Sequence, residues 1–272
     1  MIEMTYRGLP EFGLPLNSPT DPTFELSLED LRNPPGPFAP PIDITMERAA
    51  VLENHTQEAL IVLGYVWRYT SASGETRSNR QLNLGSSRQM DVLTGRAKVV
   101  RDRSSFILPG ARRLITEAGI FGDNRDVLPK EPSIVAMSWM GSGGGGGHGA
   151  GLEPSDAVQV VLELDVAIFE DGLCVGPDEL CLRESLTEQL QAQSRVLNEI
   201  VEALRSGAAL GRIFEILRPF ARNQSRVPSA QYFFRHSAIN QLVNFDGAEL
   251  SAWFEAEAAL SPLRLHQHPR TS

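Results

Sequence analysis

The chain has 272 residues, of which 42% are hydrophobic, and its formal net charge is −9 at pH 7. This length and apolar content allow one large or two moderate domains, and every apolar run is too short to cross a bilayer. The acidic balance, without a recognised nucleic-acid-binding motif, argues against nucleic acid as a partner. The first residues contain no apolar run typical of a signal peptide, so we expect a cytoplasmic protein, and an exported one if the sequence starts too late.

Residues 1–42 predict an N-terminal arm. The first 41 residues hold nine of the 18 prolines of the chain, and such a composition disfavours helices and strand ladders. Apolar residues such as Phe12, Leu14 and Phe24 interrupt the polar background. We therefore expect parts of this arm to lie against a folded body.

Residues 43–176 have the pattern of β-structure. Apolar and polar side chains alternate almost without fault over 157–169, which predicts a strand with one face on a core. Residues 59–70 are apolar on both faces, as in a central strand with Trp67 in the core. Shorter strands are expected at 44–52, 76–84, 97–101, 105–108, 113–118 and 133–140. Seven or eight short strands separated by turn residues are typical of a β-sandwich.

The segment around Trp67 carries a resemblance. Its strand lies between an Asn-x-Thr turn at 54–56 and a Ser-x-x-Gly hairpin at 71–74. Through these motifs, residues 43–206 resemble immunoglobulin-like and fibronectin-like domains. The chain is also similar to uncharacterised bacterial proteins with such a sandwich and a helical extension, in the segments 106–110, 166–172 and 175–178. The resemblance implies an immunoglobulin-like β-sandwich of seven or eight strands and no particular activity. The cysteine pair typical of antibody domains is absent around Trp67.

Residues 177–272 predict an α-helical module. Apolar residues recur at three- and four-residue steps from Leu182 to Leu204, which indicates one long amphipathic helix ending at Gly207. Gln193 interrupts this apolar stripe. Further helices are expected at 208–217, 229–245 and 248–260. The stripe needs a cover, which is either an internal core or a dimer seam, with these residues at the contact: Leu190, Leu197 and Ile200.

The charges are unevenly distributed. Residues 77–113 carry a net charge of +7, whereas residues 114–182 carry −10. Opposite charges on neighbouring strands stabilise their pairing, so we expect the two segments to neutralise each other. An anion-binding patch is the alternative.

A glycine-rich segment, 141–151, contains Ser142 and His148. No Lys-Ser or Lys-Thr pair follows it, and a strand rather than a helix comes next, so it lacks the pattern of a phosphate-binding or dinucleotide-binding loop. We expect a connecting loop, or a loop that binds a partner.

Two acids of strand 157–169, Glu163 and Asp165, are predicted to point outward on one face, about 7 Å apart. That separation suits a carboxylate pair for glycoside hydrolysis, and it is equally ordinary on a solvated sheet face. Cys174 and Cys181 have the wrong spacing for a CxxC motif, and we expect two buried thiols, with a local disulfide as the alternative.

These patterns give no catalytic, cofactor-binding or metal-ligating set. The hypothesis is a non-enzymatic interaction or structural protein that binds a protein partner or a second copy of itself, with no cofactor. Its candidate interaction residues are Ser142, His148, Leu190, Leu197 and Ile200. A carbohydrate-binding or hydrolytic domain that uses outward acids such as Glu163 and Asp165 is one alternative, and a subunit of a larger assembly is another.

Overall fold

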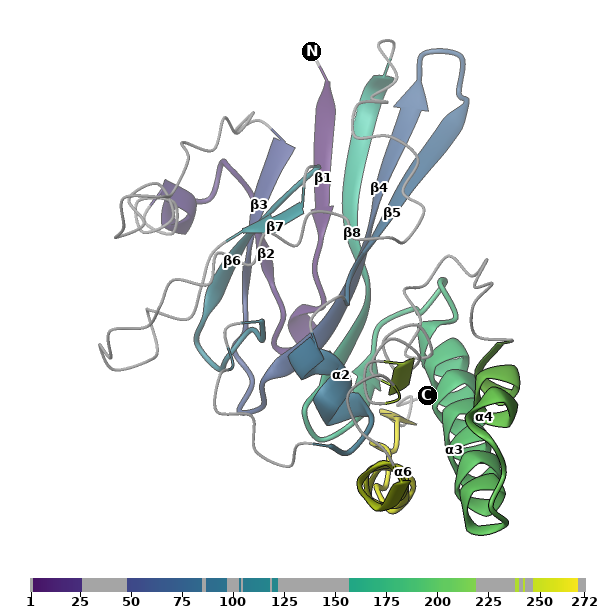
Figure 1. Ribbon diagram of the computed structural model, residues 1–272. Coiled ribbons are helices and arrows are strands. Elements are labelled where there is room, and N and C mark those ends of the chain that lie inside the picture. Colours follow the sequence, from purple (N-terminus) through teal and green to yellow (C-terminus); the bar gives the residue numbers. More distant parts are fainter. Residues whose placement is uncertain are drawn as a thin grey trace, which may run out of the picture. The chain divides into compact units, whose positions relative to one another are not determined.

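The computed structural model describes residues 2–25, 48–84, 87–96, 103, 105–117, 119–121, 157–218, 238–239, 242 and 247–268. The chain forms two compact units, whose elements are labelled in Figure 1. The β unit consists of Met1–Leu84, Asp102–Leu180 and His266–Ser272. The helical unit consists of Gly85–Arg101 and Cys181–Leu265.

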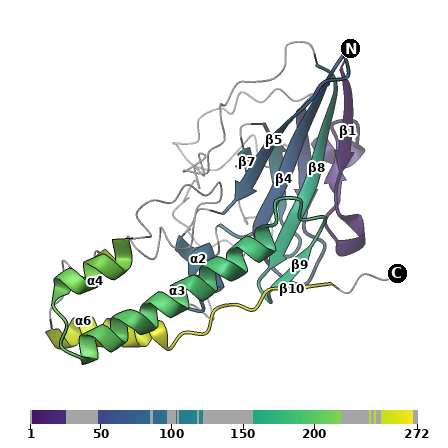
Figure 2. The same cartoon turned by 90° about the vertical axis from the view of Figure 1, so that its right-hand side faces the viewer.

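The larger sheet of the β unit is built around the long strand β8, Ala157–Phe169, whose predicted bounds are confirmed. One edge of β8 pairs antiparallel with β4, Leu60–Ser71, which in turn pairs antiparallel with β5, Thr76–Asn83. In β4 the side chains of both faces are buried over most of its length, as expected of a central strand. These three strands lie side by side in Figure 2.

The other edge of β8 pairs with two short strands. β1, Glu3–Arg7, runs parallel to β8, and β9, Leu173–Val175, runs antiparallel to it. β10, His266–Gln267, then pairs parallel with β9, which completes a six-stranded mixed sheet. The first and last described segments of the chain thus both enter this sheet.

A smaller antiparallel sheet forms the second layer of the β unit. Its strands follow one another in the order β2, β3, β6 and β7: Leu16–Asn17, Ala49–Glu53, Arg112–Thr116 and Gly119–Phe121. A short 3-10 helix, η1, Pro10–Phe12, separates β1 from β2. Leu60 of β4 and Ile107 exchange backbone hydrogen bonds of 2.9 Å. This bridge is all that forms at 105–108, where a strand was expected.

The core of the β unit contains an aromatic row. Tyr65, Trp67 and Tyr69 alternate along one face of β4 and are 1%, 0% and 4% exposed. Leu162 and Leu164 of β8 lie beside them, because Trp67 is paired with Leu162 and Tyr65 with Leu164. The prediction that Trp67 lies in the core is therefore confirmed.

The predicted immunoglobulin-like β-sandwich followed by a helical C-terminal module is wrong. The larger sheet mixes parallel and antiparallel pairs, with β1 parallel to β8 and β10 parallel to β9. A helix, α2, Ser87–Leu93, lies between β5 and β6 and belongs to the helical unit. β1 forms in the predicted arm because residues 3–7 contain no proline and can complete a ladder. Alternation of side chains identifies strands, but it does not specify which strands pair.

The long helix α3, Leu182–Arg205, carries the predicted apolar stripe. Its residues Leu197, Ile200 and Val201 join a buried cluster with residues of α4, Leu210–Leu217, and α6, Gly247–Ala258. The stripe therefore faces an internal core of the helical unit, which was one of the two expected covers. Among the described residues, no helix is both long and apolar enough to cross a membrane.

Several expected segments lie outside the described residues. These are the strands at 97–101 and 133–140, the loop at 141–151 with Ser142 and His148, and all but three residues of the helix at 229–245.

Candidate functional site

Asp165 organises the turn that leads out of the larger sheet. It is the additional residue of a β-bulge, because Gly64 is paired with Val166 and Tyr65 with Leu164. Its Oδ1 accepts a hydrogen bond from the backbone N–H of Glu179 (2.8 Å), and its Oδ2 accepts one from that of Leu180 (3.1 Å). Its carbonyl oxygen accepts the N–H of Asp178 at 2.9 Å. Both oxygens of this carboxylate thus accept hydrogen bonds from the backbone of the turn at residues 178–180.

The predicted outward position of Asp165 is wrong, since the residue is only 2% exposed. The bulge shifts the alternation, so Asp165 no longer shares the face of Glu163. A second register shift between Thr70 and Ser71 leaves Val158 without a partner on β4, and Val158 is 45% exposed although the alternation placed it on the core face. Burial raises the pKa of Asp165, although the two backbone hydrogen bonds lower it.

Arginines of the larger sheet surround Glu163 of β8 and Glu179 of the turn after β9. The Arg68 guanidinium bonds Glu179 at 2.7 Å through Nη2 and Glu163 at 3.2 Å through Nε. Arg7 lies 3.8 Å from Glu163, and Arg80 lies 3.8 Å from Glu179. The hydrogen bond from Arg68 lowers the pKa of Glu179, and the same bond raises the pKa of Arg68. Each carboxylate of this cluster is therefore already paired.

These pairs also account for part of the charge pattern. Arg80 and Arg103 belong to the basic segment 77–113, and they pair with Glu179 and Glu170 of the acidic segment 114–182. The expected neutralisation of the two segments is confirmed at these two pairs.

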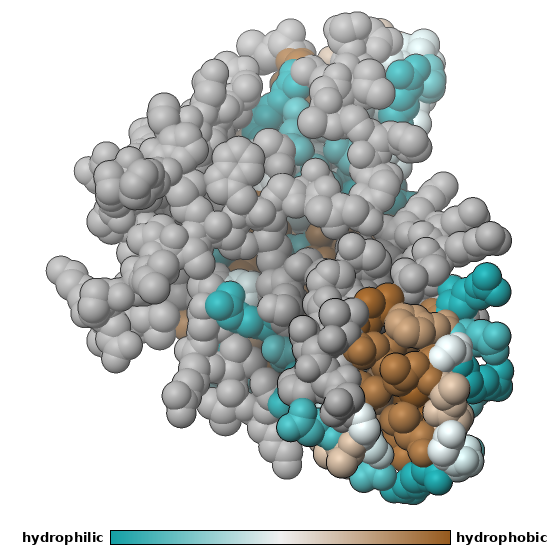
Figure 3. Space-filling view, viewed as in Figure 1, coloured by the Kyte–Doolittle hydropathy of each residue, from teal (hydrophilic) through white to brown (hydrophobic). Residues whose placement is uncertain are grey.

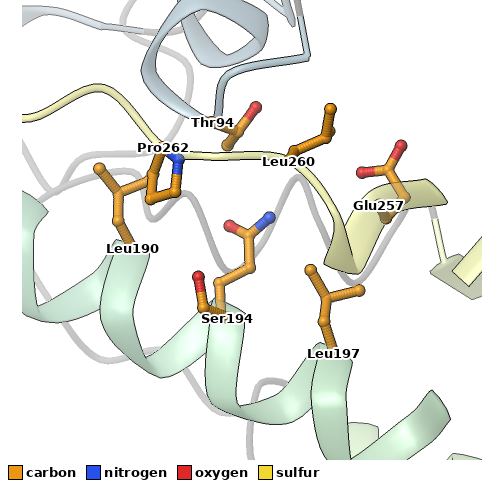
Figure 4. A pocket seen from close by; sticks show the side chains of 8 residues that line it. Thr94, Leu190, Ser194, Leu197, Glu257, Leu260 and Pro262 are labelled. Atoms are coloured by element: carbon orange, nitrogen blue, oxygen red, sulfur yellow. The ribbon is translucent and has the colours of Figure 1, made fainter. Parts of the chain in front are cut away.

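The helical unit contains a small pocket (Figure 4). Leu190, Gln193, Ser194 and Leu197 of α3 form one wall, and the opposite wall comes from these four residues: Thr94, Glu257, Leu260 and Pro262. Figure 4 shows Ser194 and Leu197 projecting from α3 towards the side of Leu260 and Glu257. The centre of a water molecule can move through only about 10 Å³ of it. The pocket is polar and about the size of one water.

Gly95 allows the chain to close this pocket. The residue follows α2 and has a φ of +77 degrees, in the left-handed region of the backbone. A side chain there would meet the carbonyl oxygen of Ser261, which lies 2.0 Å from the position of a Cβ atom. Next to this crossing, the N–H of Leu263 donates to the carbonyl of Leu93 at 2.9 Å. Glycine is therefore required where α2 meets the segment that follows α6.

Glu257 is the charged group of the pocket and is only 8% exposed. Arg96 binds it with two parallel hydrogen bonds, Nε to Oε1 at 3.0 Å and Nη2 to Oε2 at 2.6 Å. The third nitrogen of Arg96 donates to Asp91 at 3.0 Å. Burial tends to lower the pKa of Arg96, but the bonds and charges of Glu257 and Asp91 outweigh it and raise the pKa.

The predicted interaction residues that the structure describes, Leu190, Leu197 and Ile200, are buried. Leu190 and Leu197 line the pocket and are each 4% exposed, whereas Ile200 is fully buried in the helical core. The sequence reasoning missed Gln193 as a pocket residue. Its position as a polar interruption of an apolar stripe was the signal that could have identified it.

An exposed apolar surface lies on α4. Figure 3 shows apolar side chains gathered over α3 and α4, bordered by hydrophilic ones. Leu210 and Phe214 are 48% and 46% exposed, and with Val158 they are the exposed large hydrophobic residues of the described chain. They stand four residues apart and therefore on the same side of the helix.

Among the described residues, the two cysteines form no disulfide with each other and no metal-ligand cluster is found. Cys174 is buried in β9 and Cys181 is exposed, so the expectation of two buried thiols is wrong for Cys181. Within the described ranges, no three His, Cys, Asp or Glu side chains gather in the manner of metal ligands.

In comparisons with known proteins, no family model, curated protein or solved structure matches this chain. The site is therefore interpreted from its own chemistry.

Proposed function

We propose that this protein is a non-enzymatic interaction protein that associates with a second copy of itself through α4. The observation that carries the proposal is the exposure of Leu210 and Phe214 side by side on one short helix. Each remains about half exposed, while Ile213, Ile216 and Leu217 of the same helix are buried. Covering such side chains removes apolar surface from water, which is the main favourable term in association.

The patch itself favours a second copy as the partner. About a two-fold axis, Leu210 and Phe214 of one chain can cover the same two side chains of the other. Arg212, which pairs with Glu199 (3.3 Å) and Glu215 (3.4 Å), stands two positions from each of them in the sequence. It therefore lies on the other side of α4, and the contact buries no charge of this group.

The expected association is weak. With eight residues, α4 is about 12 Å long, which is small beside the roughly 800 Å² that each partner buries in a standard interface. We therefore expect a dissociation constant in the micromolar range or above. The dimer would form at high local concentration or within a larger assembly.

Light scattering over a range of concentrations tests the proposal. The average mass of the wild-type protein should rise with concentration, and Phe214→Asp should remain monomeric, because a carboxylate would be buried in the interface. Val158→Asp is the matched control, since Val158 is equally exposed but lies in the β unit. It should associate like the wild type, and circular dichroism should show that all three proteins are folded.

Two results would overturn the proposal. A wild-type mass that stays monomeric at the highest attainable concentration would exclude a second copy as the partner. Equal loss of association in Phe214→Asp and Val158→Asp would show that the contact is not specific to α4.

A further inference from the structure

Gln193 presents an unsatisfied acceptor inside the helical unit. The residue is 5% exposed, and its Oε1 is buried without a hydrogen-bond partner. A buried carbonyl oxygen without a partner is rare in folded proteins, because the group gives up its bonds to water and gains nothing. Gln193 also lines the small pocket of the helical unit, so we assign this acceptor to the pocket.

We propose that this pocket is a binding site for one ordered water molecule, which donates a hydrogen bond to Gln193 Oε1. The size of the pocket supports this ligand. About 10 Å³ is open to the centre of a water molecule, and one buried water needs roughly 10–15 Å³ by this measure.

The polar groups of the wall require a ligand that donates hydrogen bonds. Thr94 uses its hydroxyl proton on the carbonyl of Met90 at 2.7 Å, so its oxygen can only accept. Both carboxylate oxygens of Glu257 accept bonds from Arg96 and retain further lone pairs. The hydroxyl of Ser194 can donate or accept. A water has two protons to donate and can accept a bond from Ser194, which fits this wall.

The charge balance favours water over a cation. The negative charge of Glu257 is already compensated by the bidentate contact with Arg96. An ammonium or metal ion would bring a further positive charge beside that guanidinium, with no carboxylate left to pair with it. Water therefore satisfies the acceptors without adding charge.

This site links α3 to α6, because Gln193 and Glu257 line the same one-water pocket. The apolar cluster of the helical unit fixes how closely these helices pack. A bridging water adds a polar contact that depends on direction, and so favours one arrangement of the two helices.

The sign of the stability change in Gln193→Met tests the proposal. If a water bridges Gln193, methionine removes one of its partners, and the melting temperature should fall by roughly 2–4 °C. If Oε1 is simply unsatisfied, the apolar side chain removes that penalty, and the melting temperature should rise. Gln189→Met is the matched control, because Gln189 lies one turn earlier, is 8% exposed, and donates to Ser185 Oγ at 3.1 Å. It should lower the melting temperature in either case.

Two measurements separate water from other occupants. A high-resolution crystal structure should show a water within hydrogen-bond distance of Gln193 Oε1. Melting temperatures in ammonium chloride and sodium chloride of equal ionic strength should agree. A rise specific to ammonium that is lost in Gln193→Met would overturn the water assignment. A higher melting temperature for Gln193→Met, with an empty site in the crystal, would overturn the proposal altogether.

Discussion

The two units bury one described carboxylate each, Asp165 in the β unit and Glu257 in the helical unit, and they satisfy it differently. Asp165 accepts backbone N–H groups from residues 14 and 15 positions later in the chain. Glu257 accepts the guanidinium of Arg96, which is 161 positions away. The first arrangement needs no counter-charge, whereas the second depends on one particular side chain.

This difference has a physical consequence. The partners of Asp165 are main-chain groups that every residue except proline provides, so a local turn suffices to hold them. The partner of Glu257 must be brought close by the fold of the whole helical unit. We therefore expect the β unit to be sensitive to the loss of its carboxylate, and the helical unit to the loss of either side chain of its pair.

The largest expected effect comes from a similar contrast between two tryptophans. Trp67→Ala should lower the free energy of unfolding by about 3–5 kcal/mol, because the side chain is fully buried in the β unit. Trp253 is only partly buried, with its ring 4.8 Å from that of Phe254, so Trp253→Ala should cost about half as much. Urea unfolding with separate probes for each unit measures both changes.

Trp67→Phe is the control for volume. The indole N–H of Trp67 is buried without a partner, so phenylalanine removes an unsatisfied donor and leaves a smaller gap than alanine. Its cost should be well below that of Trp67→Ala. Equal urea midpoints for wild type and Trp67→Ala would contradict the position of β4 at the centre of the core.

The position of Trp67 also shows which parts of the fold can be predicted from the sequence. The strand 157–169, the central strand with Trp67 and the long helix were predictable because each depends on a periodic pattern within one segment. The pairing of β1 with β8 was not, because residues 3–7 and 157–169 carry no local signal of each other.

The candidate sites show the same division. The bulge at Asp165 adds one residue to a strand whose side chains alternate almost without fault in the sequence, so the pattern predicted the wrong face for Asp165. The contact between Arg96 and Glu257 joins distant segments and leaves no trace in either. Gln193 was visible as a polar residue in an apolar stripe, but its pocket depends on residues that follow α6.

A smaller effect is expected from Asp165→Asn. One amide oxygen can replace one carboxylate oxygen, but the amide N–H₂ would face a backbone N–H group, so we expect a loss of about 1–3 kcal/mol. Glu257→Gln, the matched variant of the helical unit, should cost less, because Arg96 is 35% exposed and keeps its bond to Asp91. High salt should reduce the loss of stability in Glu257→Gln and leave the loss in Asp165→Asn unchanged. Urea titrations at two salt concentrations measure this difference.

The stability loss in Asp165→Asn is expected to depend on pH. Burial raises the pKa of Asp165 above its usual value. Such a carboxyl group contributes stability that is fully present below its unfolded pKa and is lost as the pH rises through its folded pKa. The stability difference between wild type and Asp165→Asn should therefore grow as the pH falls from about 7 to about 4. Glu179, whose pKa is lowered by Arg68, has the opposite dependence but is present in both proteins. A difference that shrinks on acidification would show that the hydrogen bonds outweigh burial.

The smallest expected change in stability comes from a comparison of the two cysteines, one from each unit. Cys181 is exposed before the first turn of α3, whereas Cys174 is 3% exposed in β9. A thiol reagent added to the native protein should modify one residue rapidly, and mass spectrometry of peptides should identify it as Cys181. Cys181→Ser should abolish the rapid phase and change the free energy of unfolding by less than about 0.5 kcal/mol, since the replaced side chain lies on the surface. Equally rapid modification of Cys174 would mean that the three-residue strand β9 opens far more readily than the long strand β8 beside it.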